Sequence, residues 1–397
     1  MNIRELSARL SGLVVFRGIL QDPVLEKFRT ALRALEAGDA VDALAEFESA
    51  LLARTCNWTE YLLEAVLEDE NLCIRRRMPL PDGTPLAPCL TGELDFFSQL
   101  SQVTLPQLLQ EAGAAGEAGR FLPPWDTAPA DFAAAYEKRV AEAGRRGYGM
   151  FAKYHVFSVS GGALVPVRYP DSQTLAELPG YEREREKVLA NTRALLSGGP
   201  AANVLLYGDA GTGKSSTVKA IANAFAPEGL RLVEVKKNQL HQIPELMDSL
   251  ARNPLKFILF IDDLSFTAND DNFAALKAIL EGSVCGNPRN IAVYATSNRR
   301  HLVKETFTDR DGDELHAADT RQELMSLSAR FGLTVTFLRP EKQRFRDIVL
   351  ALADRYGIKA PEDTLVTQAE AFALRAGGRS PRVAKQFLQL YQSGVTM

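Results

Sequence analysis

The sequence predicts an α/β protein, in which a three-layer domain around a parallel sheet lies between a mostly helical region and a small helical region. Three observations predict this class. Short β-rich runs alternate with helical patterns from about residue 201 to 338, which is typical of parallel sheets covered by helices. A glycine-rich turn follows the first of these runs and opens a helix. Residues 341–397 hold helical patterns and no strand candidate.

Length and charge set broad limits. The chain has 397 residues, enough for two or three domains. Basic residues number 46 and acidic residues 50, so the formal charge is −4. This small acidic excess does not indicate a protein that coats a polyanion. It is compatible with a local basic patch. The four cysteines form no C-x-x-C pair, so we expect reduced thiols and no structural metal. We find no signal peptide and no apolar stretch approaching the ~18 residues of a membrane span, and expect a cytoplasmic protein without a membrane partner.

Residues 1–145 are predicted to form a mostly helical domain with a possible partner-binding surface. The stretch DPVLEKFRTALRALEAG places Asp22 as N-cap, Pro23 at the first helical position and Gly38 at the end. A second helical pattern, DAVDALAEFESALL, follows directly. Residues 146–200 are expected to contain a β-hairpin that turns at 160–162 and a charged helix that leads into the core.

The core is predicted over residues 201–340 and a helical lid over 341–397. Five β-rich runs define the sheet: NVLLY, LRLVEV, KFILFI, NIAVYAT and LTVTF. Three helical patterns around Phe345–Tyr356, Asp363–Ala376 and Ser380–Tyr391 define the lid.

The turn GDAGTGKSS carries the strongest chemical signal. It has the G-x-x-x-x-G-K-[ST] spacing, in which main-chain N–H groups and the helix N-terminus converge on phosphate oxygens. Lys214 is expected to reach the β- and γ-phosphates and the Ser215 hydroxyl to ligate Mg²⁺. A glycine turn with an incidental lysine is the alternative, which the strand before it and the helix after it disfavour. The predicted nucleotide-binding residues are Gly208, Asp209, Ala210, Gly211, Thr212, Gly213, Lys214, Ser215 and Ser216.

Two aspartates end the apolar run FILFIDD. We expect this strand to lie beside the strand of the glycine turn, so that Asp262 holds Mg²⁺ together with Ser215. Asp263 would orient or deprotonate the attacking water. Aspartate is one methylene shorter than glutamate, which puts rapid hydrolysis in doubt. The alternative is a solvated strand end that caps the next helix.

The segments GDAGTGKS, FILFIDDLSF, YATSNRRHL and SLSARFG together resemble the AAA+ P-loop ATPases, and more narrowly a bacterial family of AAA+-type ATP-binding proteins designated DUF815, a domain of unknown function. The resemblance covers about residues 150–397, and only the first segment is specific by itself. It identifies the glycine turn as a Walker A motif and Asp262 as a Walker B residue. Where Asp263 stands, the wider superfamily has glutamate.

The resemblance also implies roles outside the two Walker motifs. Asn298 matches the sensor-1 residue, whose amide contacts the γ-phosphate or the water; simple strand termination by Thr296–Asn298 is the alternative. Arg330 resembles an arginine finger that reaches a neighbouring subunit, unless it is a surface arginine at a helix end. Arg382 resembles the sensor-2 arginine of the lid; Arg379 is a rival, and either arginine could instead be solvated.

These features lead to an expected AAA+ ATPase that hydrolyses ATP with Mg²⁺, forms a homo-oligomeric ring or partial ring, and remodels an unidentified protein or nucleic-acid target. An ATP-gated switch or adaptor with slow or no hydrolysis is the alternative. A small-molecule kinase is a weaker hypothesis, because no acceptor site can be recognised in the sequence. A GTPase is weaker still, because no N-K-x-D motif follows residues 291–296. Arginines in 299–300 and 375–382 would be the contacts of a DNA-handling protein.

Overall fold

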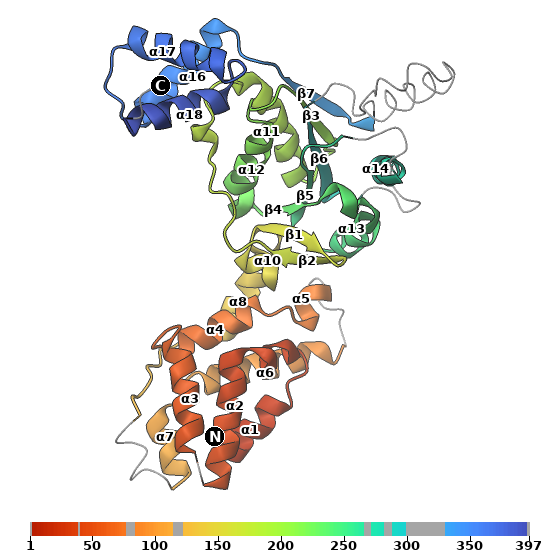
Figure 1. Ribbon diagram of the computed structural model, residues 1–397. Helices are drawn as coiled ribbons and strands as arrows, with labels where there is room; N and C mark the ends of the chain where they lie inside the picture. Colours follow the sequence, from red (N-terminus) through yellow and green to blue (C-terminus); the bar gives the residue numbers. More distant parts are fainter. Residues whose placement is uncertain are drawn as a thin grey trace. The chain divides into compact units, whose positions relative to one another are not determined.

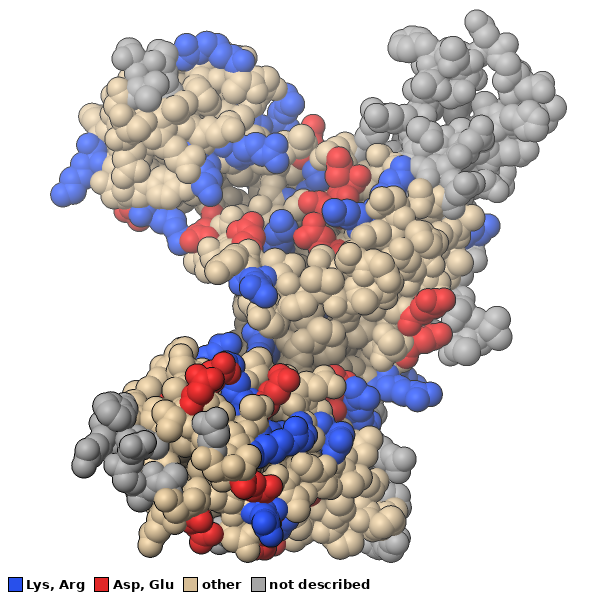
Figure 2. All heavy atoms as spheres, turned by 60° about the horizontal axis from the view of Figure 1, so that its bottom comes forward, with Lys and Arg blue, Asp and Glu red and all other residues tan. Residues whose placement is uncertain are grey.

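The computed structural model describes residues 2–38, 40–76, 84–113, 122–265, 271–281, 288–298 and 330–394. The chain divides into two compact units, Met1–Lys153 and Tyr154–Met397 (Figure 1). Among the described residues, no helix is long and apolar enough to cross a membrane. Acidic and basic side chains are interspersed over the face shown in Figure 2, in keeping with the small net charge of −4.

A seven-stranded sheet organises the second unit, in the order β2-β1-β4-β5-β6-β3-β7. All neighbouring strands are parallel except β1 and β2, which form a hairpin. This sheet confirms the predicted α/β fold class. The hairpin is part of the sheet, because β1 pairs with β4. The strands are β1 (Val156–Ser160), β2 (Ala163–Pro166), β3 (Val204–Gly208), β4 (Leu230–Glu234), β5 (Lys256–Ile261), β6 (Ile291–Ser297) and β7 (Leu333–Phe337).

One expectation about the sheet is wrong. The strand that carries the paired aspartates, β5, does not lie beside β3, because β6 is inserted between them. All seven residues of β6 are buried, which is why this strand takes an interior place in the sheet instead of an edge. The polar end of β6 therefore lies between the glycine turn and the aspartates.

Helices cover both faces of the sheet. In Figure 1, α11 and α12 lie on one face and α13 and α14 on the other. The helix after the glycine turn, α12, buries Val218 and Ile221 in the same apolar cluster as Leu206 and Phe260 of the sheet. The described helices of this unit are α11 (Glu182–Leu196), α12 (Lys214–Phe225), α13 (Ile243–Ala251), α14 (Asp271–Glu281), α16 (Lys342–Arg355), α17 (Glu362–Arg375) and α18 (Pro381–Gln392), with short 3-10 turns η3 (Leu175–Glu177), η4 (Ala226–Glu228) and η5 (Lys237–Gln242).

The last three of these helices, α16 to α18, form the lid. Phe345 and Phe387 of the lid belong to the apolar cluster that also fills the space between the sheet and α11. Tyr181, just before α11, stacks on Phe337 at the end of β7, with ring centroids 5.4 Å apart. Its hydroxyl donates a hydrogen bond to the carbonyl of Leu338, 2.5 Å away. The lid thus shares one apolar core with the sheet and α11.

The first unit consists of helices around its own core. Its second helix, α2, begins as predicted: the Asp22 carboxylate accepts the N–H groups of Val24 and Leu25, and Gly38 ends the helix with φ 88°. Aromatic rings from α2, α3 and α4 meet in the centre of this core. The described helices are α1 (Ile3–Ser11), α2 (Pro23–Ala37), α3 (Val41–Leu52), α4 (Trp58–Glu68), α5 (Leu72–Arg76), α6 (Leu86–Leu100), α7 (Leu105–Glu111), α8 (Phe132–Ala141), α9 (Ala143–Arg146) and α10 (Met150–Lys153), with the 3-10 turn η1 (Arg17–Gln21).

A buried carboxylate interrupts this core. Glu48 of α3 is 2% exposed, and neither carboxylate oxygen has a hydrogen-bond partner among the described residues. Burial raises the pKa of Glu48 from 4.5 to about 7. Because the folded state binds this proton more tightly than the unfolded chain does, the group destabilises the folded unit progressively as the pH rises from 4.5 toward 7.

We therefore expect Glu48→Gln to stabilise the protein at pH 8 by roughly 2–3 kcal/mol and to leave it nearly unchanged at about pH 5, where Glu48 is mostly protonated in the folded state. Urea denaturation at the two pH values measures both effects. Glu46→Gln is the matched control, because Glu46 lies on the same helix with 59% of its side chain exposed and pairs with Lys27 at the surface. Parallel pH profiles for wild type and Glu48→Gln would contradict this assignment.

Candidate functional site

A pocket of about 890 Å³ opens at the carboxyl ends of the parallel strands, where ligands of such sheets bind. The glycine turn forms one wall through residues 210–216, and the ends of β5 and β6 form the floor. The remaining walls come from the lid and from residues 171–179, which precede α11. The lid residues are Leu352, Arg355, Tyr356, Pro381, Arg382, Lys385 and Gln389.

Two glycines of the turn have structural reasons to be glycine. Gly208 has φ 138°, and an added Cβ would lie 2.1 Å from the carbonyl oxygen of Phe337. Gly213 has φ 93° and is the N-cap of α12, which aims the positive end of that helix at the pocket. Glycine at positions 208 and 213 therefore allows the turn to approach β7 closely and to expose its N–H groups to the pocket.

Lys214 is the most constrained charge of the site. Its ammonium group donates to the carbonyl oxygens of Gly208 and Asp209, each 2.8 Å away, and to Oδ1 of Asn298 at 2.9 Å. The residue is only 6% exposed. Burial lowers the pKa of Lys214, and the carboxylates of Asp209, Asp263 and Asp262 oppose this shift. An incoming anion would thus meet a positioned, largely dehydrated cation.

Ser215 and Asp262 meet in the way the sequence predicts. The Ser215 hydroxyl donates to Oδ1 of Asp262 over 2.6 Å. The inserted strand contributes a second hydroxyl to the same oxygen, because Oγ1 of Thr296 lies 2.5 Å away. Thr296 is 2% exposed and also accepts the N–H of Asp263. Its position explains how β5 is held to the site although β6 separates it from β3.

Asp263 has an unusual backbone. Its φ is 51°, in the left-handed region, where aspartate and asparagine are better tolerated than other side chains that carry a Cβ. Its Oδ1 accepts a hydrogen bond of 2.8 Å from Nδ2 of Asn298. The short carboxylate thus fits both the backbone and the amide, which gives a local reason for aspartate at this position.

Among the lid arginines, Arg382 faces the pocket and Arg379 does not line it. The main-chain N–H of Arg382 donates to the carbonyl of Gly211 over 3.2 Å, which joins the lid to the glycine turn. Arg379 pairs instead with Glu370, with both carboxylate oxygens 2.9 Å from its Nε. The remaining predicted arginine, Arg330, lies just before β7 and does not line the pocket formed by the described residues.

Two other predicted residues contact the site through their main chains. Gly208 and Asp209 place carbonyl oxygens on Lys214, while the Asp209 carboxylate accepts the N–H of Arg339 over 2.7 Å. Ala210, Gly211, Thr212, Gly213 and Ser216 line the pocket as predicted neighbours of Lys214. Arg299 and Arg300 lie outside the described residues.

The residues present fit both a nucleotide and a magnesium ion. The hydroxyl of Ser215 and the carboxylate of Asp262 are hard oxygen donors, and their 2.6 Å separation is close to the roughly 2.9 Å edge of an octahedral Mg²⁺ site. No group of three or more His, Cys, Asp or Glu side chains that could hold a metal by themselves occurs in the described part of the chain. A magnesium ion that keeps waters and phosphate oxygens among its ligands suits so sparse a donor set.

A family model described as "Protein of unknown function (DUF815)" matches residues 151–395. The chain belongs to this family. The match spans the second unit, including the glycine turn, the paired aspartates and the lid. The fold of this DUF815 protein is an α/β fold, with the glycine turn at the carboxyl end of a strand in a mostly parallel sheet and a helical lid beyond it. No curated protein matches the chain.

Solved structures similar to this DUF815 chain include two of RuvB from Thermotoga maritima. One, a lysine-to-arginine point mutant, has a TM-score of 0.37 and 16% identity, over 55% of this chain and 65% of that one. A structure titled as the Holliday junction branch migration motor has a TM-score of 0.34 and 15% identity, over 55% of this chain and 72% of that one. Neither likeness bears on what this chain binds or does.

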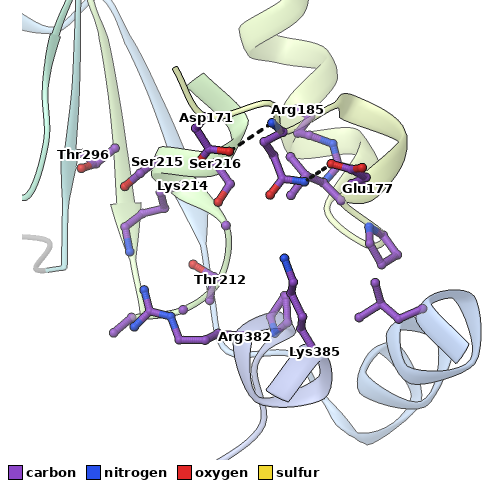
Figure 3. Close-up of a pocket in the computed structure, with 18 of the residues that line it drawn as sticks. Asp171, Glu177, Arg185, Thr212, Lys214, Ser215, Ser216, Thr296, Arg382 and Lys385 are labelled. Atoms are coloured by element: carbon purple, nitrogen blue, oxygen red, sulfur yellow. Dashed lines mark hydrogen bonds between the residues drawn. The ribbon is translucent and has the colours of Figure 1, made fainter. Parts of the chain in front are cut away.

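Several pocket residues escape the sequence analysis. Thr296 is treated there only as a strand end, although a threonine two residues before the polar Asn298 on one strand already places a hydroxyl beside it. Lys385 follows Arg382 by three residues on α18, a spacing that puts both on one helix face, and Figure 3 shows both reaching into the pocket. Glu177 and Arg355 carry no motif and are brought together only by the tertiary fold.

Alanine substitutions at two glycines of the turn should lower the stability of the protein by different amounts. We expect Gly208→Ala to destabilise the protein by about 2–5 kcal/mol and to weaken nucleotide binding, because its Cβ would overlap the Phe337 carbonyl. Gly213→Ala is the matched control: its φ is also positive, but nothing lies within 4 Å of the added Cβ, so only about 1–2 kcal/mol should be lost. Urea denaturation compares them. If Gly208→Ala and Gly213→Ala lost equal free energies of unfolding, the result would contradict the close approach of the turn to β7.

Proposed function

We propose that this protein is a Mg²⁺-dependent ATPase that assembles into oligomers and couples its nucleotide state to the remodelling of a macromolecular target. One observation carries the proposal: Lys214, Ser215, Asp262, Asp263 and Asn298 converge on a single pocket from three different strand ends. A cation, a metal-binding pair and a carboxylate–amide pair are the groups that transfer of a phosphoryl group to water requires.

Each side chain has a role that follows from its contacts. Lys214 and the N–H groups of the turn bind the β- and γ-phosphates. Ser215 and Asp262 hold Mg²⁺, which neutralises charge on the transferred phosphoryl group when it is bound. Asp263 accepts a proton from the attacking water, and Asn298, already hydrogen-bonded to both Lys214 and Asp263, orients that water. Arg382 contacts the phosphates from the lid.

The pocket also has apolar groups that suit a nucleoside. Leu178, Pro179, Leu352 and Tyr356 are among its lining residues. Apolar and aromatic groups with a few polar neighbours are typical of ligand pockets. We therefore propose that ATP binds with its phosphates at the turn and its base between the lid and residues 171–179.

Oligomerisation is proposed from Arg330. This residue lies outside the pocket of its own subunit, which agrees with an arginine that completes the site of a neighbouring copy. Contacts of that head-to-tail kind close into a ring or continue as a partial ring. All residues that line the pocket belong to the second unit, and we assign the helical first unit the binding of the protein or nucleic-acid target.

The second candidate is an ATP-gated switch with slow hydrolysis, which Asp263 specifically favours. Its carboxylate is held by Asn298 and its backbone is in the left-handed region, so it is both short and restrained. Small displacements of a catalytic base lower the rate strongly. Steady phosphate release by the purified wild type favours the motor, whereas ATP-dependent assembly without turnover favours the switch.

We predict that Arg330→Ala binds ATP nearly normally but hydrolyses it slowly, and that Asp263→Asn is also slow. An equal mixture should recover about a quarter of wild-type turnover, because one site in four then combines an intact Asp263 with an intact Arg330 from its neighbour. Phosphate release, measured alongside nucleotide-dependent sizing of the oligomer, gives the result.

The control is a chain that carries both substitutions. When mixed with Arg330→Ala it can form no site with both groups intact, so no recovery is expected. Recovery in this control, or none in the mixture of single variants, would contradict a site shared between subunits.

A further inference from the structure

A segment without any motif forms the wall of the pocket that faces the lid. We call residues 171–179, which run from Asp171 to Pro179 and contain the turn η3, the rim segment. Six of its residues line the pocket: Asp171, Ser172, Gln173, Glu177, Leu178 and Pro179. The lid forms the wall on the other side. What holds these two walls together determines how the pocket opens.

The P-loop helix anchors the rim segment. Asn223 on α12 donates from its Nδ2 to the carbonyl oxygens of Asp171 and Gln173, at 2.8 and 2.9 Å. Its Oδ1 lies 3.0 Å from Nε2 of His155, just before β1. Both ends of the amide are thus engaged, and the rim is tied to the same helix that begins with Lys214.

Hydrogen bonds within the rim segment fix the carboxylate of Glu177. Its Oε2 accepts the N–H of Thr174 at 3.0 Å and the side-chain amide of Gln173 at 2.7 Å. The hydrogen bond from the Thr174 backbone is the largest cause of a lowered pKa of Glu177. Burial opposes it as the next largest effect, and the charges of Arg355 and Lys385 lower the pKa further. The carboxylate is therefore ionised at neutral pH, with Oε1 directed to a partner.

That partner is in the lid. Arg355, in the last turn of α16, places its guanidinium 2.8 Å from Oε1 of Glu177, across 178 residues of sequence. Lys385 reaches into the pocket from α18 on the side opposite Glu177 (Figure 3). The two side chains of the pair are 38% and 34% exposed, so water and salt reach them. A pair of this kind is weak enough to open and re-form readily.

We propose that Glu177 and Arg355 form a latch that holds the lid to the rim segment and slows the release of bound nucleotide. The inference rests on the proposed nucleotide site. It adds that the latch sets how long a bound nucleotide stays in that site. At the other end of the pocket, the bond from the Arg382 N–H to Gly211 joins the lid to the glycine turn. The latch connects the lid to the rim segment on the other side of the pocket, so we expect a nucleoside between the walls to leave faster when the latch is open.

Stopped-flow release of N-methylanthraniloyl-ADP from the full-length protein tests the latch. We expect Glu177→Gln and Arg355→Met each to release the nucleotide about two- to fivefold faster at low salt. Glutamine keeps an oxygen for the Thr174 N–H, and methionine keeps the apolar stem. The double variant should be no faster than either single variant, since both remove the same interaction. Added salt should speed release from wild type and leave the variants nearly unchanged.

Arg346→Met is the matched control. Arg346 lies on the same helix with the same 38% side-chain exposure, but its partners, Glu362 and Asp363, belong to the lid itself. Its release rate should equal that of wild type. Additive effects of the two latch substitutions, or an equal acceleration by Arg346→Met, would overturn the latch while leaving the nucleotide site standing. A wild type that binds no nucleotide would instead overturn the proposed function and the latch with it.

Discussion

The site depends on one constraint of the sheet: β3, β6 and β5 are parallel neighbours, so their carboxyl ends meet at one edge. Each end contributes a different chemical group. Lys214 and Ser215 follow β3, Thr296 and Asn298 end β6, and the paired aspartates follow β5. Without this order, the lysine would have no amide partner and the aspartates would have no hydroxyl to hold them.

The inserted strand is more than a spacer. Thr296 and Asn298 are two residues apart and point the same way from β6. The first contacts Asp262 and the second contacts both Lys214 and Asp263. Removal of Asn298 would take a partner from the buried ammonium group of Lys214, and a buried charge with fewer partners is costly. The groups proposed to bind metal and phosphate are thereby coupled through one strand.

Much of this arrangement could be predicted from the sequence because its signals are local. Alternating patterns give the fold class, and the glycine spacing gives the turn. The order of strands could not be predicted, because it depends on which strand is buried on both faces, and β6 proved to be such a strand. The left-handed backbone of Asp263 and the pairing of Glu177 with Arg355 also depend on tertiary contacts, the second across 178 residues.

Isothermal titration of ATP with Mg²⁺ tests the central claim most directly, with Lys214→Ala beside Lys219→Ala, which changes a lysine of the same helix outside the pocket. Wild type and Lys219→Ala should bind equally. Lys214→Ala should bind at least about a hundredfold more weakly, because the charged hydrogen bonds to phosphate are lost. Undiminished affinity in Lys214→Ala, or no binding by wild type, would contradict the account.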